Sequence, residues 1–189
     1  MKTTVITAAL TGLIASAQAQ YFSITAVRSG SPIHLQNIEA AGERLSVGGN
    51  AATYCPSDLQ SRGFCPNTTQ DTNFLGGRGG LALGAEVPGG QSVYIDATCG
   101  AVMYTQAHSI FQPNTSITGG WARQEGESFG LLTWEGSGAF AGHMGFLACK
   151  AEDGSYEMYV DIGVAPPGDC IGFDAITANQ TGPAAWQYM

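Results

Sequence analysis

The stretch "YFSITAVR" (residues 21–28) alternates apolar and polar side chains, and this alternation decides the fold class. Phe22, Ile24 and Ala26 fall on one face of an extended strand, while the serine and threonine between them fall on the other. A period of two residues is the pattern of a β-strand with one buried face. We therefore expect β-structure from this stretch onward.

The same alternation recurs along the chain, in "RLSV" (44–47), "SVYIDA" (92–97), "AVMYTQ" (101–106), "FGLLTW" (129–134), "FAGHMGFLAC" (140–149) and "SYEMYVDI" (155–162). Turn signals separate these stretches, at Gly48-Gly49, "GGRGG" (76–80), "PGG" (88–90), Gly119-Gly120 and "EDGS" (152–155). Only "IEAAGERL" (38–45) leaves room for a single helical turn. The pattern predicts an all-β fold, a single antiparallel β-sandwich or barrel with short Gly/Pro-rich turns.

The first nineteen residues are predicted to be a signal peptide. Lys2 precedes a mostly apolar run over residues 5–15, and Ala17-Gln18-Ala19 is a small-x-small cleavage site. The run is shorter than the roughly 20 residues that a membrane helix needs. We expect residues 1–19 to be removed, which leaves residues 20–189 as a single secreted β-domain. The C-terminal stretch has no hydrophobic tail, so we expect no GPI anchor.

The charge balance argues against nucleic acid and membrane partners. Residues 20–189 hold six Lys and Arg against fifteen Asp and Glu, a net charge of −9. Phosphate groups are repelled by such a field, so nucleic acid and anionic lipid are poor ligands.

Two patterns suggest hydrolysis, and both have simpler explanations. "GESFG" (126–130) matches the G-x-S-x-G nucleophile elbow at Ser128, yet a strand and a Gly-rich turn follow it instead of a helix. The acids Glu125, Glu127 and Glu135 could form a glycosidase pair, but "RQEGES" reads equally well as a solvated turn. We therefore expect no enzymatic activity.

The three histidines, His34, His108 and His143, are scattered singly along the chain. No HxH, HxxH or HExxH pair presents two imidazoles from one element, as a metal site of this kind requires. We expect no metal and no cofactor. For His34 and His108 we expect partly buried side chains that are hydrogen-bonded to backbone or to a buried polar group.

Three acceptor sequons point to N-glycosylation. They begin at Asn67, Asn114 and Asn179, and each lies in a stretch that contains Pro or Gly. We expect all three in surface loops.

Seven ordered motifs carry a family resemblance: "FSITAVRSGSPIHLQNIEAAGERLSVGG" (22–49), "TYCP" (53–56), "FCP" (64–66), "VPGGQSVYID" (87–96), "YTQAHS" (104–109), "GFLAC" (145–149) and "CIGFDAIT" (170–177). In this order and spacing they resemble the phialide-development cell-wall protein family of filamentous fungi, PhiA. The resemblance covers nearly the whole mature chain. It implies a secreted wall glycoprotein needed for phialide and conidium formation, with IgE-binding allergens among its relatives. It implies wall polysaccharide or wall proteins as partners, and no catalytic residues.

The resemblance also distinguishes four of the five cysteines from the fifth. Its pattern includes Cys55, Cys65, Cys149 and Cys170, whereas relatives read roughly Asp-Pro-x-Gly where this chain has Cys99. Sequence does not choose among connectivities. We expect Cys55–Cys65 and Cys149–Cys170, because Pro and Gly flank each short loop. Cys99 then has no internal partner, which leaves an intermolecular disulfide, with a second copy or another wall protein, or a buried, inert thiol.

Two function classes stay open. The first is a structural wall protein that acts through abundance, glycosylation and adhesion to polysaccharide. The second is a lectin-like, carbohydrate-binding module, for which Trp121, Trp134 and Trp186 could provide stacking faces, although three Trp in a small β-domain more often belong to the core.

Overall fold

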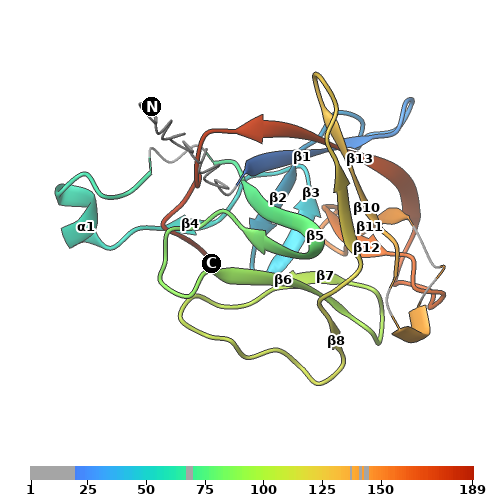
Figure 1. The fold of residues 1–189 in the computed structure, drawn as a ribbon. Helices are drawn as coiled ribbons and strands as arrows, with labels where there is room; N and C mark the ends of the chain where they lie inside the picture. Colours follow the sequence, from blue (N-terminus) through green and yellow to red (C-terminus); the bar gives the residue numbers. More distant parts are fainter. Residues whose placement is uncertain (1–19, 67–69, 137, 141, 143–144) are drawn as a thin grey trace, which may run out of the picture.

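The computed structural model describes residues 20–66, 70–136, 138–140, 142 and 145–189, so the expected signal peptide lies outside the described residues. Strands dominate the described chain, as Figure 1 shows. They are β1 (Tyr21–Val27), β2 (Ile38–Ala41), β3 (Arg44–Val47), β4 (Thr53–Tyr54), β5 (Phe74–Leu83), β6 (Gln91–Asp96), β7 (Val102–Tyr104), β8 (Ser116–Ile117), β9 (Trp121–Gln124), β10 (Gly130–Trp134), β11 (Phe146–Lys150), β12 (Tyr156–Val160), β13 (Cys170–Gln180) and β14 (Gln187–Tyr188). The helical pieces are α1 (Ser57–Ser61) and the 3₁₀ turn η1 (Gly138–Phe140).

The main sheet closes on itself. Its strand order is β1-β5-β9-β10-β13-β11-β12-β3-β7-β6-β8, with β2 on β3, and the further pairs β1–β13 and β5–β6 join strands that lie far apart in this order. All pairings between the named strands of the described chain are antiparallel. Closure pairs most strands on both sides and encloses the main core, while β2 and β8 each pair with a single strand. The all-β, antiparallel prediction is confirmed.

The core begins with the alternating stretch at the N-terminus. Phe22, Ile24 and Ala26 of β1 are fully buried, and β1 pairs with β13 along its whole length. The Phe22 ring stacks on Phe74 at a centroid distance of 6.1 Å, and Phe146 stacks on Trp121 at 6.1 Å. Each large apolar side chain that is fully buried contributes roughly 1.5–3 kcal/mol. The period-two pattern therefore identifies the residues that hold the closed sheet together.

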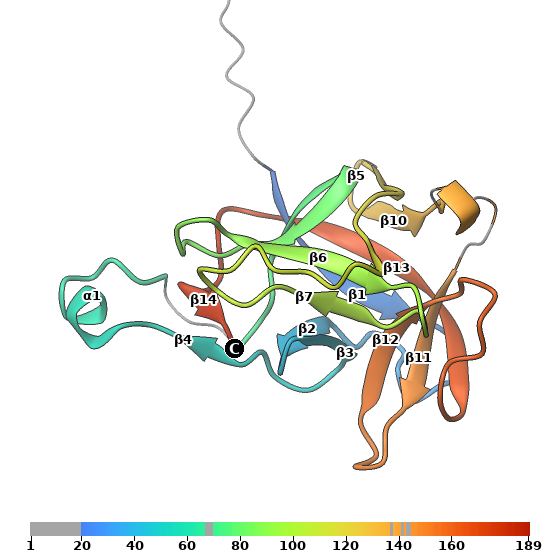
Figure 2. The ribbon, with the colours of Figure 1, turned by 90° about the horizontal axis from the view of Figure 1, so that it is seen from below.

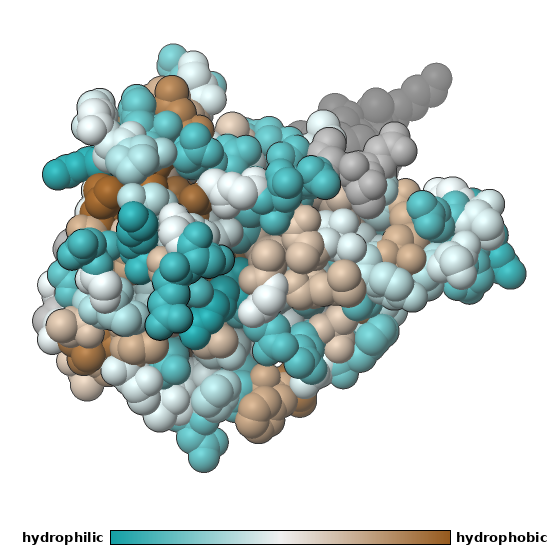
Figure 3. All heavy atoms as spheres, turned by 180° about the vertical axis from the view of Figure 1, so that it is seen from behind, coloured by the Kyte–Doolittle hydropathy of each residue, from teal (hydrophilic) through white to brown (hydrophobic). Residues whose placement is uncertain are grey.

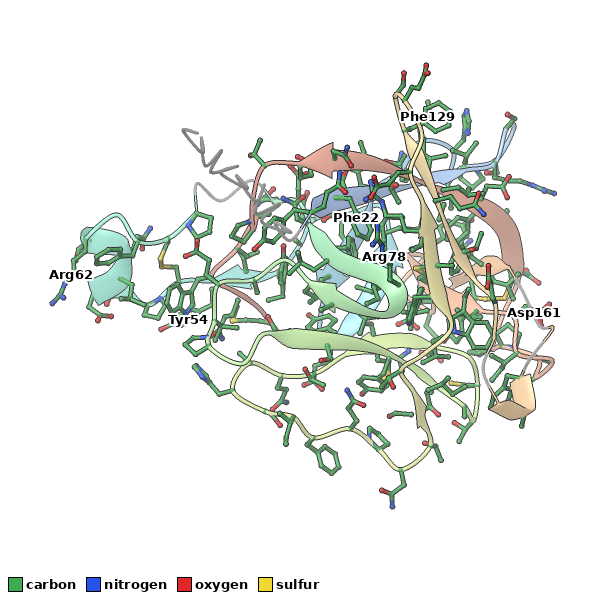
Figure 4. The ribbon with its side chains drawn as sticks, viewed as in Figure 1. Phe22, Tyr54, Arg62, Arg78, Phe129 and Asp161 are labelled. Atoms are coloured by element: carbon green, nitrogen blue, oxygen red, sulfur yellow. A yellow bond between two sulfur atoms is a disulfide. The ribbon has the colours of Figure 1, made fainter. Side chains whose placement is uncertain are left out.

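The "GGRGG" stretch (76–80) is part of β5 and not a turn between strands, so that expectation was wrong. Gly76, Gly77 and Gly79 have positive φ angles, and β5 bends at this point, as Figure 4 shows near the labelled Arg78. A Cβ on Gly77 would lie 2.5 Å from the Cβ of Arg123 on β9. The glycines let β5 bend and approach β9 while keeping its ladder with β6.

Two other local expectations need correction. "IEAAGERL" (38–45) forms the β2–β3 hairpin and no helical turn, because Ile38, Ala40 and Leu45 face the core with strand periodicity. In "FAGHMGFLAC" (140–149) the strand begins only at Phe146, after the 3₁₀ turn that ends at Phe140.

The C-terminal strand is tied into the main sheet by side-chain hydrogen bonds. The buried Gln91 of β6 accepts a hydrogen bond from the Tyr188 backbone N–H (2.8 Å) and donates one to the Tyr188 carbonyl (3.0 Å). The Tyr104 hydroxyl donates to the Met189 carbonyl at 2.8 Å. Residues from β6, β7 and β14 therefore meet at one end of the closed sheet.

The segment around α1 projects from the body of the domain (Figure 1), and no residue of α1 is buried. Its surface is mostly polar in the rear view of Figure 3, where apolar side chains form separate patches over the rest of that face. None of the helices in the described part of the chain has the length and hydropathy to cross a membrane.

Candidate functional site

The G-x-S-x-G motif occupies the tip of the β9–β10 hairpin. Ser128 is exposed there, and β10 follows it in place of a helix. Figure 4 shows the neighbouring Phe129 at the outer end of this hairpin. A nucleophile elbow holds its serine between a strand and a helix. Its geometry is therefore not present around Ser128.

The three candidate acids are split between the two ends of β10. Glu125 and Glu127 lie at the exposed tip, where Glu125 pairs with Arg123 at 3.5 Å. Glu135 follows Trp134, which pairs with Trp121 at the opposite end of the hairpin. The length of the strand thus separates Glu135 from the other two acids.

The histidines differ in their surroundings. His34 is half-buried, and its Nδ1 accepts the backbone N–H of Arg28 at 3.2 Å, as expected. His108 is exposed with a φ of 61°, so the expectation of a partly buried side chain was wrong for it. His143 lies outside the described residues. In the described ranges, no three His, Cys, Asp or Glu side chains gather as a metal site would require.

The tryptophans mostly belong to the core. Trp121 and Trp134 are each 1% exposed, and Trp134 Nε1 donates to the Gly119 carbonyl at 2.8 Å. Trp186 is only partly buried. Trp121 and Trp134 are thus unable to stack on a bound sugar.

Two sequons lie in described parts of the chain. Asn114 is exposed in the loop between β7 and β8, as expected. Asn179 lies instead in β13, opposite Phe22 of β1, and its Oδ1 accepts a hydrogen bond from the Arg123 guanidinium. Its side chain is exposed even though its backbone is part of a ladder. Asn67 falls outside the described residues.

The disulfides join the cysteines that the sequence analysis paired. Cys55 is bonded to Cys65 and Cys149 to Cys170, with Cα–Cα distances of 6.4 and 4.0 Å. Cys99 is free and half-buried. It packs against a small cluster that includes Tyr159, beside the main core.

A polar cleft of about 620 Å³ lies between the β2–β3 and β11–β12 hairpins. Its charged groups already have partners. Arg44 donates to Glu157 at 3.0 Å, and the Tyr159 hydroxyl donates to the same carboxylate oxygen at 3.1 Å. Asp153 accepts the backbone N–H and the hydroxyl of Ser155, which lowers the pKa of its carboxyl.

Two smaller hollows, of about 330 and 290 Å³, lie side by side and share three lining residues, Glu43, Tyr104 and Gln106. We call them together the Glu43 groove. The loop between β7 and β8 forms its outer wall, and Figure 2 shows this yellow-green segment crossing in front of β6 and β7. His108 lines the first hollow and Phe111 the second.

Glu43 lies at the centre of the groove in an unusual backbone conformation. Gly42 and Glu43 both have φ angles of 62° and connect the paired residues Ala41 and Arg44, so they form a two-residue hairpin turn of type I′. Gln106 Nε2 donates to Glu43 Oε1. The sequence analysis missed Glu43, although "AGER" (41–44) is a turn signal when it is read as part of a hairpin.

Glu39 is a second carboxyl group with a special environment. It is 2% exposed on β2, and its Oε2 has no hydrogen-bond partner within the described chain. Burial is the largest cause that raises the pKa of Glu39 to about 7, opposed by hydrogen bonding to Thr72 and reinforced by the nearby Asp71. This carboxyl is enclosed by protein and not part of the Glu43 groove.

Comparison with known proteins relates this chain to a family of secreted proteins. The family model described as "PhiA-like secreted protein" matches residues 22–189. The chain is 34% identical over 160 residues to an uncharacterized secreted protein of Arthroderma benhamiae, which covers 80% of this chain and 76% of that one. It is 28% identical over 191 residues to the cell wall protein phiA of Aspergillus fumigatus, with 96% and 93% covered. No solved structure matches the chain.

Proposed function

The chain belongs to the PhiA-like secreted protein family, and from this premise we propose that it is a structural glycoprotein of the fungal cell wall. The observation that carries the proposal is the similarity, over almost the full length of both chains, to a relative named as a cell wall protein. A closed sheet with two disulfides supports it, because disulfides persist in oxidising, extracellular surroundings.

We extend the proposal to the development of phialides and conidia, as the family resemblance implies. Deletion of the gene should alter the sporulating structures under the microscope, and wall fractions of the wild type should retain the protein after washing with detergent. Normal sporulation in the deletion strain would contradict the proposed role in development. Finding the protein only in the culture medium would contradict the proposed structural role in the wall.

We propose that the protein acts without catalysis. The exposed hairpin position of Ser128 and the separation of Glu135 from Glu125 support this, because hydrolases need such groups to converge. Measurable release of reducing sugar from wall polysaccharide, lost on replacement of these residues, would contradict it.

We propose that the wall protein carries N-linked sugar at Asn114 and Asn179, both of which are exposed. Mass spectrometry before and after treatment with an N-glycosidase tests each site. The exposed loops would also serve as the surface for IgE binding, which serum from sensitised patients would test.

We propose a covalent link through Cys99 as a further means of retention in the wall. The thiol is free and only half-buried at the end of the β6–β7 hairpin, which supports access by another thiol. Electrophoresis without reductant should show a cross-linked species that Cys99→Ser removes. A monomer band for both proteins, together with no labelling of the native thiol, would favour the inert alternative.

Carbohydrate binding is a second candidate function, and the Glu43 groove is the observation that favours it. A carboxylate, an amide and an exposed aromatic ring line the second hollow of the groove. Polar groups that orient a sugar beside a ring on which it can stack are typical of such sites. Binding to insoluble wall polysaccharide in a pull-down would test it.

A further inference from the structure

The backbone of the Glu43 groove is strained where the groove presents its polar side chains. Glu43 and His108 have φ angles of 62° and 61°, a region that glycine occupies without cost and other residues rarely adopt. Such a residue costs of the order of 1–3 kcal/mol, and strained residues cluster at ligand sites. Both of these lie in one hollow, which favours a role for their side chains beyond the fold.

Position 43 is the second central residue of a type I′ turn, where glycine is preferred. The turn would form more easily with glycine there, yet the chain carries a glutamate. The Glu43 carbonyl accepts the backbone N–H of Tyr104 at 3.1 Å, which fixes the turn against β7. The side chain is therefore held at a defined place on a rigid hairpin.

The Glu43 carboxylate also has hydrogen-bonding capacity left over. A carboxylate can accept about four hydrogen bonds, and the side chains of the described residues supply one, from Gln106. In the larger polar cleft, by contrast, Glu157 is neutralised by Arg44, and Asp153 is engaged by Ser155. Of these three acids, Glu43 is the one with the most hydrogen-bonding capacity left for a ligand.

The charge around this carboxylate favours a cation. Glu43 is the one Asp or Glu among the described residues that line the groove, and no Lys or Arg of the described chain lines it. Residues 20–189 carry a net charge of −9, which attracts cations and repels anions over the whole surface.

The outer wall of the groove adds an aromatic face. Phe111 is 77% exposed and lines the second hollow, while the neighbouring Ile110 is 95% exposed. The Ser109 hydroxyl accepts the Phe111 backbone N–H at 3.1 Å, which helps to fix the loop that presents the ring. A sugar ring can lie on such a face. Phe111 and Glu43 line the same hollow.

We propose that the Glu43 groove binds a polymer of amino sugars with free, protonated amines, that is, glucosamine units of partly deacetylated chitin. The Glu43 carboxylate pairs with an ammonium group, Gln106 orients the carboxylate, and Phe111 packs against the sugar ring. The inference rests on the proposed wall function, for which it names the polymer that is contacted.

The test measures binding of soluble glucosamine oligomers to the purified full-length secreted protein, by calorimetry in mildly acidic buffer. Glu43→Gln keeps an acceptor for Gln106 but removes the charge, and should weaken binding roughly ten- to hundredfold, the value of a charge-assisted hydrogen bond. Glu43→Gly should weaken binding similarly while leaving the melting temperature equal or higher, because it relieves the strained turn. Phe111→Ala should weaken binding as well.

Glu152→Gln is the matched control, since it removes one negative charge from the exposed β11–β12 turn, away from the groove, and should leave binding unchanged. If wild type and Glu43→Gln bind glucosamine oligomers with equal affinity, Glu43 is not part of the binding site. If wild type binds N-acetylated or β-glucan oligomers as tightly as glucosamine oligomers, the site does not recognise the ammonium group. If no oligomer binds while wall fractions still retain the protein, the inference fails and the proposed wall function stands.

Discussion

At the scale of single residues, the chain keeps two carboxyl groups in opposite situations. Glu39 is enclosed and lacks a partner for one oxygen, while Glu43 is presented to solvent on a strained turn. Desolvation favours the neutral form of the Glu39 carboxyl, whereas the Glu43 side chain lines the Glu43 groove. The two acids are four residues apart in the sequence. They differ in role because Glu39 is buried within the closed sheet and Glu43 lies in the turn of the β2–β3 hairpin.

Glu39 should make the stability of the domain depend on pH. Its folded-state pKa of about 7 lies above the value near 4.3 expected for the unfolded chain. The folded protein therefore binds more protons between these two values, and its free energy of unfolding should fall as pH rises through this window. The loss is on the order of 3 kcal/mol. Urea denaturation at a series of pH values measures it.

Glu39→Gln is neutral at every pH and should flatten this dependence, with the variant more stable than wild type above neutrality. Glu152→Gln should keep the dependence of the wild type, because Glu152 is exposed. An unchanged slope in Glu39→Gln would show that other groups cause it.

At the scale of the elements, the bend of β5 depends on where a side chain can fit. Gly77 and Gly79 both have positive φ angles, of 81° and 95°, but their surroundings differ. A Cβ on Gly77 would overlap Arg123, whereas a Cβ on Gly79 would meet no atom within 4 Å. Arg123 has little room to move, because it spans the Phe22 ring and the Thr177 hydroxyl.

This pair of glycines separates backbone strain from steric overlap. Gly79→Ala should cost roughly 1–2 kcal/mol, the penalty for an L-residue in the left-handed region. Gly77→Ala should cost that amount and a further 1–3 kcal/mol, because β5 or β9 must shift. Chemical denaturation of the two variants compares them. Equal losses of stability in the two variants would mean that β5 or β9 shifts without a cost in free energy.

The sequence predicts elements well where a local pattern decides them, and poorly where a distant neighbour does. The alternation of β1 identifies Phe22 and Ile24 as core residues, and both are fully buried. "GGRGG" looks like a turn because only β9, more than forty residues further on, explains why a strand needs glycine there. The Glu43 groove is missed for the same reason, since it forms only when the β7–β8 loop reaches the β2–β3 hairpin.

At the scale of the whole molecule, the two disulfides constrain different parts of the structure. Cys149 and Cys170 face each other on paired strands of the closed sheet, and Cys149 is buried. Cys55 and Cys65 instead close the projecting segment around α1, which contributes no buried residue. The Cys149–Cys170 bridge therefore constrains the core, and the Cys55–Cys65 bridge constrains the exposed segment around α1.

We expect the two bridges to differ in their effect on global stability. On the chain-entropy model each loop closure is worth about 3 kcal/mol when the native loop is fixed. Cys149→Ala with Cys170→Ala should lose about that amount. Cys55→Ala with Cys65→Ala should lose less than about 1 kcal/mol, because the released segment also gains freedom in the native state. Urea denaturation of both double variants decides it, and equal losses would contradict the distinction.

The pairing of β1 with β13 also sets an order of events during synthesis. Phe22 and Asn179 are partners although 157 residues separate them, so the first strand emerges long before its neighbour exists. At roughly 5–20 residues per second, it waits about 8–30 s. The pairing that closes the sheet therefore forms only after β13 has been synthesised. The Asn179 sequon becomes part of a ladder at that moment, so N-glycosylation before that point, which we propose for Asn179, would act on a chain whose β1 and β13 are still unpaired.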